Sequence, residues 1–236
     1  MKVLVIAAHP DDEVLGMGGT IKKLSKQGHE IKIVIMATGI GARRSVNFKN
    51  KTKYSVTKNE EKTILKQIRD VQNHSRKAAK ILGVKEISFL NFPDNEMDTI
   101  SLLEVIKSIE NEISNFNPEI VYTHTHFDVN IDHRICYQAV LSATRPQKGT
   151  KIKQVISYEV PSSTEWFFPS TFSPNIFVDI SKEISAKKNA LKSYKNEIRK
   201  FPHPRSTEAL DSISKRWGSV SSFNNAEAFY LVRKLE

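Results

Sequence analysis

Residues 3–13 read VLVIAAHPDDE, so the chain changes from apolar to charged within a few positions. An apolar run of this length, followed by a helix-like pattern at residues 14–26, is typical of a buried strand that leads into a helix. The turn between them holds an imidazole and several carboxylates, which are costly to bury unless they are paired or coordinated. In open α/β sheets, ligands bind at the carboxyl ends of the strands. The stretch therefore predicts a metal site with a carboxylate base beside it.

Strand-like and helix-like segments alternate along the rest of the chain. Further strands are expected at residues 31–36, 87–90, 120–123, 153–159 and 175–180, and helices at residues 59–82, 101–115, 131–144 and 182–200. Strands joined by helical crossovers form mostly parallel sheets. We therefore expect an α/β fold: a Rossmann-like, mostly parallel sheet flanked by helices, with extra C-terminal strands and a cap. No sharp linker divides the chain, so residues 1–236 are expected to form a single domain.

The segment between the second strand and the second helix, residues 39–58, is polar and basic and shows no apolar period. Long loops in compact domains are commonly binding loops or lids. We therefore expect a binding loop or a lid here, with Arg43 and Arg44 near its start.

Composition limits the chemistry of the chain. Its 236 residues include a single cysteine, Cys136, which excludes an internal disulfide and a cysteine-rich metal cluster. The N-terminal apolar run is too short for a signal peptide, and no run approaches the length that spans a membrane. A cytoplasmic location is therefore expected. The formal net charge of +10 is compatible with nucleic acid, an anionic substrate or a solvated basic surface.

A second group of histidines and acids follows another apolar strand, where residues 123–134 read THTHFDVNIDHR. Because both groups follow strands, we expect them to meet at one edge of the sheet. His9 and Asp12 from the first turn, with His133 from the second, then supply nitrogen and oxygen ligands. This set leaves one position open for water, as in catalytic zinc sites. Asp11 is not needed as a ligand, so we expect it to take a proton from that water.

These segments resemble the PIG-L/LmbE-like family of zinc-dependent N-acetylglucosaminyl de-N-acetylases. The resemblance spans nearly the whole chain: AHPDDEVLG at residues 8–16 with GGT at 18–20, FPDN at 92–95, DVNIDHR at 128–134, EVPSSTEW at 159–166 and PHPRS at 202–206. The first and third motifs are the specific ones. The later motifs resemble a subgroup found with bacterial genes for surface polysaccharides and sugar modification.

The resemblance implies a role for each matching residue of the two turns. The zinc ligands are matched by His9, Asp12 and His133. Asp11 matches the general base. Asp132 matches an acidic neighbour of the last ligand, which orients an imidazole.

One position departs from the family pattern. Family members often have a histidine three positions before the last ligand, where this chain has Asn130. An amide donates a hydrogen bond to an oxyanion but cannot act as an acid. The proton for the leaving amine is then expected from Asp11 alone, or from His124, His126 or His203.

Substrate contacts are expected in several loops. The resemblance places a sugar-binding arginine after the second strand, which Arg43 or Arg44 matches, and a sugar-binding carboxylate in the FPDN motif, which is Asp94. The polar turns of the C-terminal third hold further residues that could complete the pocket: Glu159, Glu165, His203 and Arg205.

Three other interpretations fit parts of the sequence. The glycines at positions 16, 18 and 19 follow a strand, but they lack the dinucleotide-binding spacing, and the acidic turn would repel a pyrophosphate. They are expected to allow close packing of helix on sheet. A magnesium-dependent phosphohydrolase would suit the carboxylates, whereas two histidine ligands favour zinc. A nucleic-acid-binding module would suit the basic charge, but basic and aromatic residues are not interleaved.

The sequence thus predicts an enzyme, a zinc-dependent N-deacetylase that acts on an N-acetylglucosamine-type sugar derivative. A nucleotide-linked or lipid-linked sugar from polysaccharide or glycoconjugate metabolism would suit the basic loop. The expected partner is this small molecule rather than nucleic acid, and a homo-oligomer is compatible with the sequence. The alternatives are a metal-dependent hydrolase of another amide or of a phosphoester, and a basic nucleic-acid-binding module.

Overall fold

The computed structural model describes residues 1–40, 58–169 and 172–236. Within these residues a seven-stranded sheet has the order β3-β2-β1-β4-β5-β7-β6. The strands are β1 (Lys2–Ala7), β2 (Glu30–Ala37), β3 (Glu86–Phe92), β4 (Ile120–His124), β5 (Gln154–Tyr158), β6 (Ile176–Asp179) and β7 (Ala226–Lys234).

The sheet is mixed. Its parallel part consists of five neighbouring strands, β3, β2, β1, β4 and β5. Strand β7 is antiparallel to both of its neighbours, β5 and β6. The expected α/β fold with a mostly parallel sheet and extra C-terminal strands is confirmed. Strand β7 was not among the expected strands, so the sequence indicated neither the strand nor its insertion between β5 and β6.

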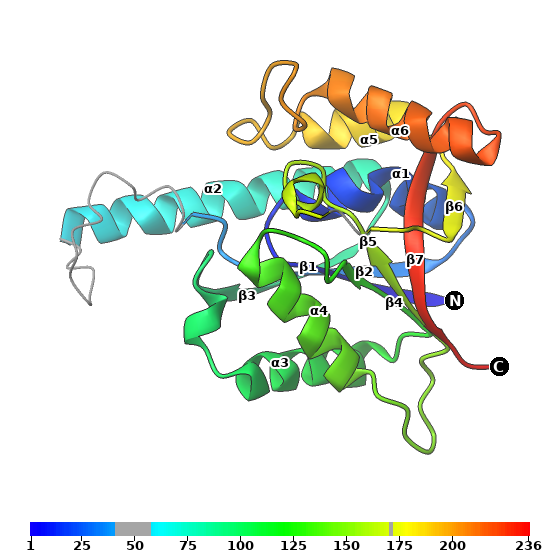
Figure 1. Cartoon of the computed structure of the whole chain (residues 1–236). Coiled ribbons are helices and arrows are strands. Elements are labelled where there is room, and N and C mark those ends of the chain that lie inside the picture. Colours follow the sequence, from blue (N-terminus) through cyan, green and yellow to red (C-terminus); the bar gives the residue numbers. More distant parts are fainter. Residues whose placement is uncertain (41–57, 170–171) are drawn as a thin grey trace.

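Helices cover both faces of the sheet (Figure 1). One face carries α3 (Leu102–Phe116) and α4 (Ile131–Ala143), which contact each other. The opposite face carries α1 (Asp12–Lys26) and α2 (Lys58–Leu82), and α5 (Ile184–Leu191) packs on these two helices. Helix α6 (Thr207–Ser221) contacts α5 and the strands β7 and β6. Two short 3-10 turns, η3 (Met97–Thr99) and η4 (Thr164–Trp166), lie in the connecting loops.

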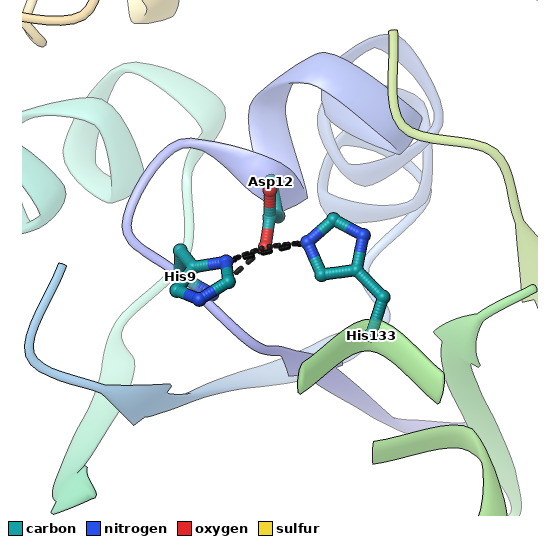
Figure 2. Close-up of side chains that lie close together, drawn as sticks. All are labelled: His9, Asp12 and His133. Carbon is teal, nitrogen blue, oxygen red and sulfur yellow. Dashed lines mark hydrogen bonds and ion pairs between the residues drawn. The ribbon is translucent and has the colours of Figure 1, made fainter. Parts of the chain in front are cut away.

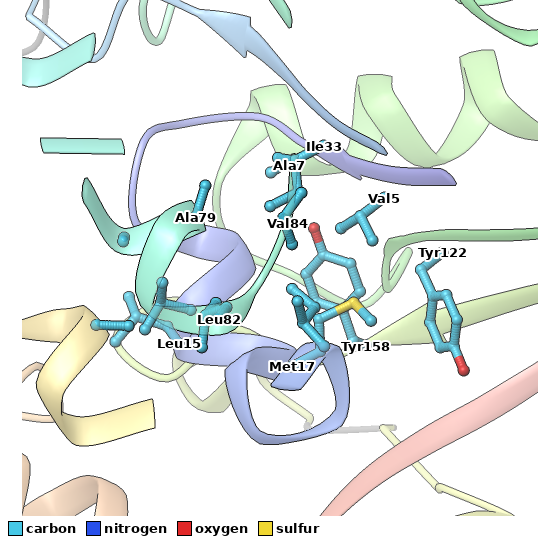
Figure 3. Close-up of a cluster of buried hydrophobic side chains, with 14 of the residues drawn as sticks. Val5, Ala7, Leu15, Met17, Ile33, Ala79, Leu82, Val84, Tyr122 and Tyr158 are labelled. Carbon is cyan, nitrogen blue, oxygen red and sulfur yellow. The ribbon is translucent and has the colours of Figure 1, made fainter. Parts of the chain in front are cut away.

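The alternation of side chains in β1 produces two cores. Val3 and Val5 point to the side of α1 and α2, where they join the cluster drawn in Figure 3. Leu4 and Ile6 point to the side of α3 and α4. Because β1 is buried on both faces, it reads as a continuous apolar run rather than as an alternating pattern.

Helix α1 is kinked and packs closely on the sheet. Met17 has non-helical backbone angles, φ −144° and ψ 23°. A Cβ atom on Gly16 would overlap the Tyr158 ring, and one on Gly19 would lie within 2.8 Å of three Ile180 side-chain carbons. Close helix–sheet packing is therefore found at Gly16, and Gly19 packs on the residue that follows β6, whereas Gly18 faces Lys187 of α5.

The C-terminal third differs from the expected elements. A helix over residues 182–200 was expected, but α5 ends at Leu191. The chain then makes turns that bury Tyr194 and Glu197 against the rest of the protein. Tertiary contacts of these two side chains therefore override the local helical pattern. Their turn carries residues 197–206 to the carboxyl edge of the sheet.

None of the helices in the described part of the chain is both long enough and apolar enough to cross a membrane.

Candidate metal centre and active-site pocket

The two polar turns lie at the point where the strand order reverses. The chain passes from β1 to β2 on one side, whereas β4 pairs with β1 on the other side. A crevice therefore opens between the carboxyl ends of β1 and β4, which is where open α/β sheets bind ligands. The turns after these strands lead directly into α1 and α4.

The turn after β1 holds its acidic side chains in a fixed conformation. Asp11, at the N-cap of α1, has φ 110°, a value that is unusual for a non-glycine residue. Its backbone N–H donates to Glu13 Oε2 at 3.1 Å, and the Tyr194 hydroxyl donates to the other oxygen of Glu13. Asp12 Oδ2 accepts the backbone N–H of His9 at 2.8 Å. The positive end of the α1 dipole further favours acids at this position.

The turn after β4 is organised by a helix cap. Asn130 is the N-cap of α4, and its side-chain oxygen accepts the backbone N–H of Asp132 at 2.9 Å. Asn130 N–H in turn donates to Asp128 Oδ1 at 2.8 Å. These contacts place Asp132 and His133 in the first turn of α4, facing the β1 turn.

One donor atom from each of His9, Asp12 and His133 lies close to the other two (Figure 2). Their mutual distances define a nearly equilateral triangle. His9 Nδ1 lies 3.4 Å from Asp12 Oδ2 and 3.3 Å from His133 Nε2, and the last two atoms are 3.2 Å apart. In a tetrahedral zinc site with bonds of 2.0–2.1 Å, ligand atoms are about 3.3 Å apart. The triangle therefore fits a tetrahedral divalent metal that keeps one further position.

Each imidazole of the triangle has a carboxylate behind it. Asp132 Oδ2 lies 3.0 Å from His9 Nε2, and Asp128 Oδ2 lies 3.0 Å from His133 Nδ1. Asp132 also accepts the backbone N–H groups of Asn95 and Met97, which fixes its own position. Carboxylates in this arrangement set the tautomer and ring orientation of metal-binding histidines.

The charges of the three triangle residues shift one another's pKa values. Burial disfavours the charged forms, but the nearby carboxylates raise the pKa of His9 well above its ordinary value and raise the pKa of His133 to about 9. Burial likewise opposes ionisation of Asp12, yet the two histidines hold its pKa well below the usual range. The site thus favours positive charge at its centre, as a metal-binding site requires.

Asp11 lies beside the triangle in a different environment. Its carboxyl is 2% exposed, and burial raises its pKa to about 7 against the opposing effect of Arg205. Arg205 Nη1 lies 3.4 Å from Asp11 Oδ2 and 3.0 Å from Glu197 Oε2, while Arg205 Nε donates to Ser162 Oγ at 2.8 Å. Arg205 directly precedes Ser206, the N-cap of α6.

A pocket of about 110 Å³ opens next to the triangle. In the described part of the chain, its lining includes several residues expected at the site, His9, Asp11, Asp94, Asn130 and Arg205, together with Pro10, Gly39, Asn95 and Glu197. Asp94 is buried, and its Oδ1 lies 3.2 Å from His9 Nε2. Arg43 and Arg44 lie outside the described residues.

The three histidines considered as proton donors are not among the lining residues of this pocket. His124 is fully buried behind His133. His126 is exposed and its ring lies beside Phe127 and Tyr137. His203 is partly buried, and its Nδ1 accepts the backbone N–H of Arg205.

Two acids expected near the pocket have other partners. Glu159 accepts a hydrogen bond from Trp217 Nε1 at 2.5 Å. Glu165 accepts the backbone N–H groups of Ser162 and Ser163. Glu165 therefore shapes the turn that holds Ser162 under Arg205.

Sequence reasoning did not assign Asp128, Glu13 and Glu197, which the structure places around the site. Asp128 and Glu13 stand inside the motifs quoted above, so their position near the candidate ligands was a usable signal. Glu197 falls in a segment that reads as helix, and its approach to Arg205 depends on the turn after α5.

A known protein family matches the part of the chain that contains both polar turns. The sequence profile of the PIG-L family, described as GlcNAc-PI de-N-acetylase, matches residues 4–144, which is more than half of the chain. This chain belongs to the PIG-L family.

Relatives of this PIG-L protein extend the similarity beyond the profile. An uncharacterized deacetylase of Escherichia coli K12, YaiS, is 33% identical over 200 residues, which cover 82% of this chain and 90% of the relative. The diacetylchitobiose deacetylase of Thermococcus kodakarensis is 29% identical over 239 residues, which cover 98% of this chain and 83% of the relative.

Among solved structures, the N,N'-diacetylchitobiose deacetylase of Pyrococcus horikoshii superposes with a TM-score of 0.73 at 24% identity. The match covers 98% of this PIG-L protein and 84% of the other chain. At this level of identity the similarity concerns the fold. The expected membership in a family of deacetylases is confirmed by the profile and the relatives together.

Proposed function

We propose that this protein is a zinc-dependent N-deacetylase that removes the acetyl group from an N-acetylglucosamine-type sugar. The observation that carries the proposal is the triangle of His9, Asp12 and His133 donor atoms beside the pocket that also holds Asp11. Two histidines and one carboxylate with an open fourth position are the ligand set of hydrolytic zinc sites.

The metal and the protein have separate tasks in this reaction. A divalent metal held by the triangle supplies Lewis acidity, which acidifies water and polarises a carbonyl. Asp11 accepts the proton of the attacking water and returns it to the nitrogen of the leaving amine. Arg205 and Glu197 hold the Asp11 side of the pocket in place through their ion pair.

Asn130 supports the oxyanion that forms at the acetyl carbonyl. Its side-chain oxygen is used by the helix cap, and its Nδ2 donates to Asn95 Oδ1 at 2.9 Å. The amide nitrogen carries a second hydrogen, and the residue lines the pocket. A hydrogen bond from a preorganised amide stabilises developing negative charge without any proton transfer.

The sugar class follows from relatives and from the polar lining. Two relatives are named for sugar deacetylation, the diacetylchitobiose deacetylase of Thermococcus kodakarensis and an N-acetyl-α-D-glucosaminyl L-malate deacetylase, described as probable, of Bacillus cereus. Asp94 and Asn95 offer oxygens to sugar hydroxyls at the pocket. Arg43 and Arg44 remain candidates for the sugar-binding arginine, and the basic loop that holds them would suit a nucleotide-linked or lipid-linked substrate.

The test is acetate release from purified protein of known metal content. The substrates are N-acetylglucosamine, N,N'-diacetylchitobiose, a nucleotide-linked N-acetylglucosamine and a lipid-linked one. We expect release from at least one substrate, its loss with a chelator and its return with zinc. Metal bound to each chain without release from any substrate would contradict the deacetylase proposal.

Two histidine variants test whether zinc binding and acetate release depend on the donor triangle. His133→Ala removes a donor atom of the triangle, so zinc content and acetate release should both fall to background. His126→Ala changes an exposed histidine outside the pocket lining and should leave both at the wild-type level. Full zinc content in His133→Ala would refute the ligand assignment.

A further inference from the structure

A histidine outside the donor triangle contacts both turns that form it. His124 is the last residue of β4 and is fully buried. It is not among the pocket-lining residues of the described chain. From this position His124 can orient the proposed metal ligands, but it does not reach the pocket to transfer a proton to substrate.

The first contact joins His124 to the turn that carries His9. Backbone pairing between β1 and β4 runs from Val3 to Val5, so it ends before Ala8. At Ala8 the His124 ring replaces the missing backbone acceptor, because its Nε2 accepts the Ala8 N–H at 2.8 Å. Strand β2 holds the other side of Ala8, where the Ala37 N–H donates to its carbonyl oxygen. The N–H and the carbonyl group of Ala8, the residue before His9, are thus both held by hydrogen bonds.

The second contact joins His124 to the other turn. Its ring stacks on the ring of His133, with centroids 4.0 Å apart and planes inclined by 20°. The lone pair of His124 Nε2 points at the Ala8 N–H, so it is used there and does not supply a fourth metal ligand. The Nε2 atom lies 3.6 Å from Asp12 Oδ2, a donor atom of the triangle.

We propose that His124 is a positioning residue of the metal centre, and that its Nε2 aligns His9 with His133 by accepting the Ala8 N–H. Buried backbone N–H groups require a partner. Without this acceptor, the turn after β1 would shift to satisfy Ala8, and the His9 donor atom would move out of the triangle. The inference rests on the metal site proposed above.

Two substitutions separate the hydrogen bond from the stacking contact. His124→Gln keeps an acceptor near the position of Nε2 and loses the aromatic ring. His124→Phe keeps a ring against His133 and loses the acceptor. Zinc affinity is measured by competition with a chromophoric chelator, and the cobalt(II)-loaded proteins are compared by their visible absorption, which reports coordination geometry.

We expect His124→Phe to weaken zinc binding roughly 10- to 100-fold, the usual effect of losing a residue that supports metal ligands. Its cobalt(II) bands should change, whereas His124→Gln should stay close to wild type in both measurements. Unchanged zinc affinity in His124→Phe would overturn the proposal. Equal losses in both variants would also overturn it, because the hydrogen bond would then not be the decisive contact.

A matched control tests general destabilisation. Thr144→Val removes a buried hydroxyl that donates to the Val140 carbonyl at 2.8 Å, at the far end of the helix that begins beside His133. It should lower the urea midpoint of the metal-free protein without changing zinc affinity. A loss of affinity in Thr144→Val like that in His124→Phe would overturn the positioning role. A wild-type protein that binds no metal would instead refute the proposed function.

Discussion

At the scale of single residues, neighbouring acids in one turn have opposite environments. Asp12 faces two histidines, which hold its pKa well below the usual range. Burial raises the pKa of Asp11 to about 7 despite Arg205. This separation is typical of sites where one carboxylate binds a cation and its neighbour exchanges protons.

Asp11→Asn tests the proton-exchange role. Asparagine tolerates positive φ well, so the backbone angle of 110° at this position should persist. Asparagine cannot accept a proton from water, and we expect kcat to fall roughly 100- to 10,000-fold. Zinc content measured by atomic absorption should remain that of wild type. Full turnover in this variant would remove Asp11 from the mechanism.

Asp128→Asn tests the carboxylate behind His133. The two oxygens of Asp128 accept hydrogen bonds from Ser163, Thr164 and Asn130 in addition to the ring. An amide NH2 would face one of these donors, so the ring orientation should be lost. We expect zinc affinity to fall roughly 10- to 100-fold.

Asp98→Asn is the control for this change, because Asp98 is exposed on η3. Its zinc affinity should equal that of wild type. An unaffected Asp128→Asn would show that His133 is held by the protein without its carboxylate partner.

At the scale of elements, the last strand contacts helix α1 just after its kink. Glu227 of β7 accepts the backbone N–H groups of Gly19 and Thr20, just after the kink at Met17. The buried Lys187 of α5 neutralises Glu227 at 2.7 Å. Glu227 thus caps the part of α1 that follows the kink. Asp12 lies in the part of the same helix that precedes the kink.

Glu227→Gln should therefore destabilise the protein by about 3–5 kcal/mol, because it leaves the Lys187 charge buried without its partner. The free energy of unfolding in urea measures the effect. The double variant Lys187→Met, Glu227→Gln should recover part of the loss.

Lys26→Met is the control. It breaks the ion pair of the exposed Lys26 with Glu183 and should lower the free energy of unfolding by about 1 kcal/mol or less. Similar costs for the buried and the exposed pair would contradict this account.

At the scale of the whole molecule, the donor triangle joins β1 to β4 across the reversal of strand order. A metal bound there holds both turns together, so binding should stabilise the fold as a whole. At a free zinc concentration a hundred times Kd, the gain is about 2.7 kcal/mol. Urea unfolding with and without zinc measures it, and His133→Ala should show no gain. A zinc-dependent gain in His133→Ala would place the metal elsewhere.

Much of the fold and of the site could be predicted from the sequence, because the signals are local. The buried run of β1 and the adjoining helical patterns predict an α/β sheet without knowledge of distant contacts. The position of His9, Asp12 and His133 after two such strands predicts their meeting, since parallel strands bring their carboxyl ends to one edge. The profile match confirms the resemblance that these motifs carry.

Other features were decided only by tertiary structure, because they depend on contacts between distant residues. The sequence places Asp132 next to His133, yet Asp132 supports His9 from the opposite turn. Arg205 reaches Asp11 only because α5 ends early, and a helix through residue 200 would have carried the chain elsewhere. His124 contacts both turns because β4 ends beside Ala8. Local patterns thus determined most of the elements and the candidate metal ligands, whereas strand order and packing determined the partner of each buried side chain.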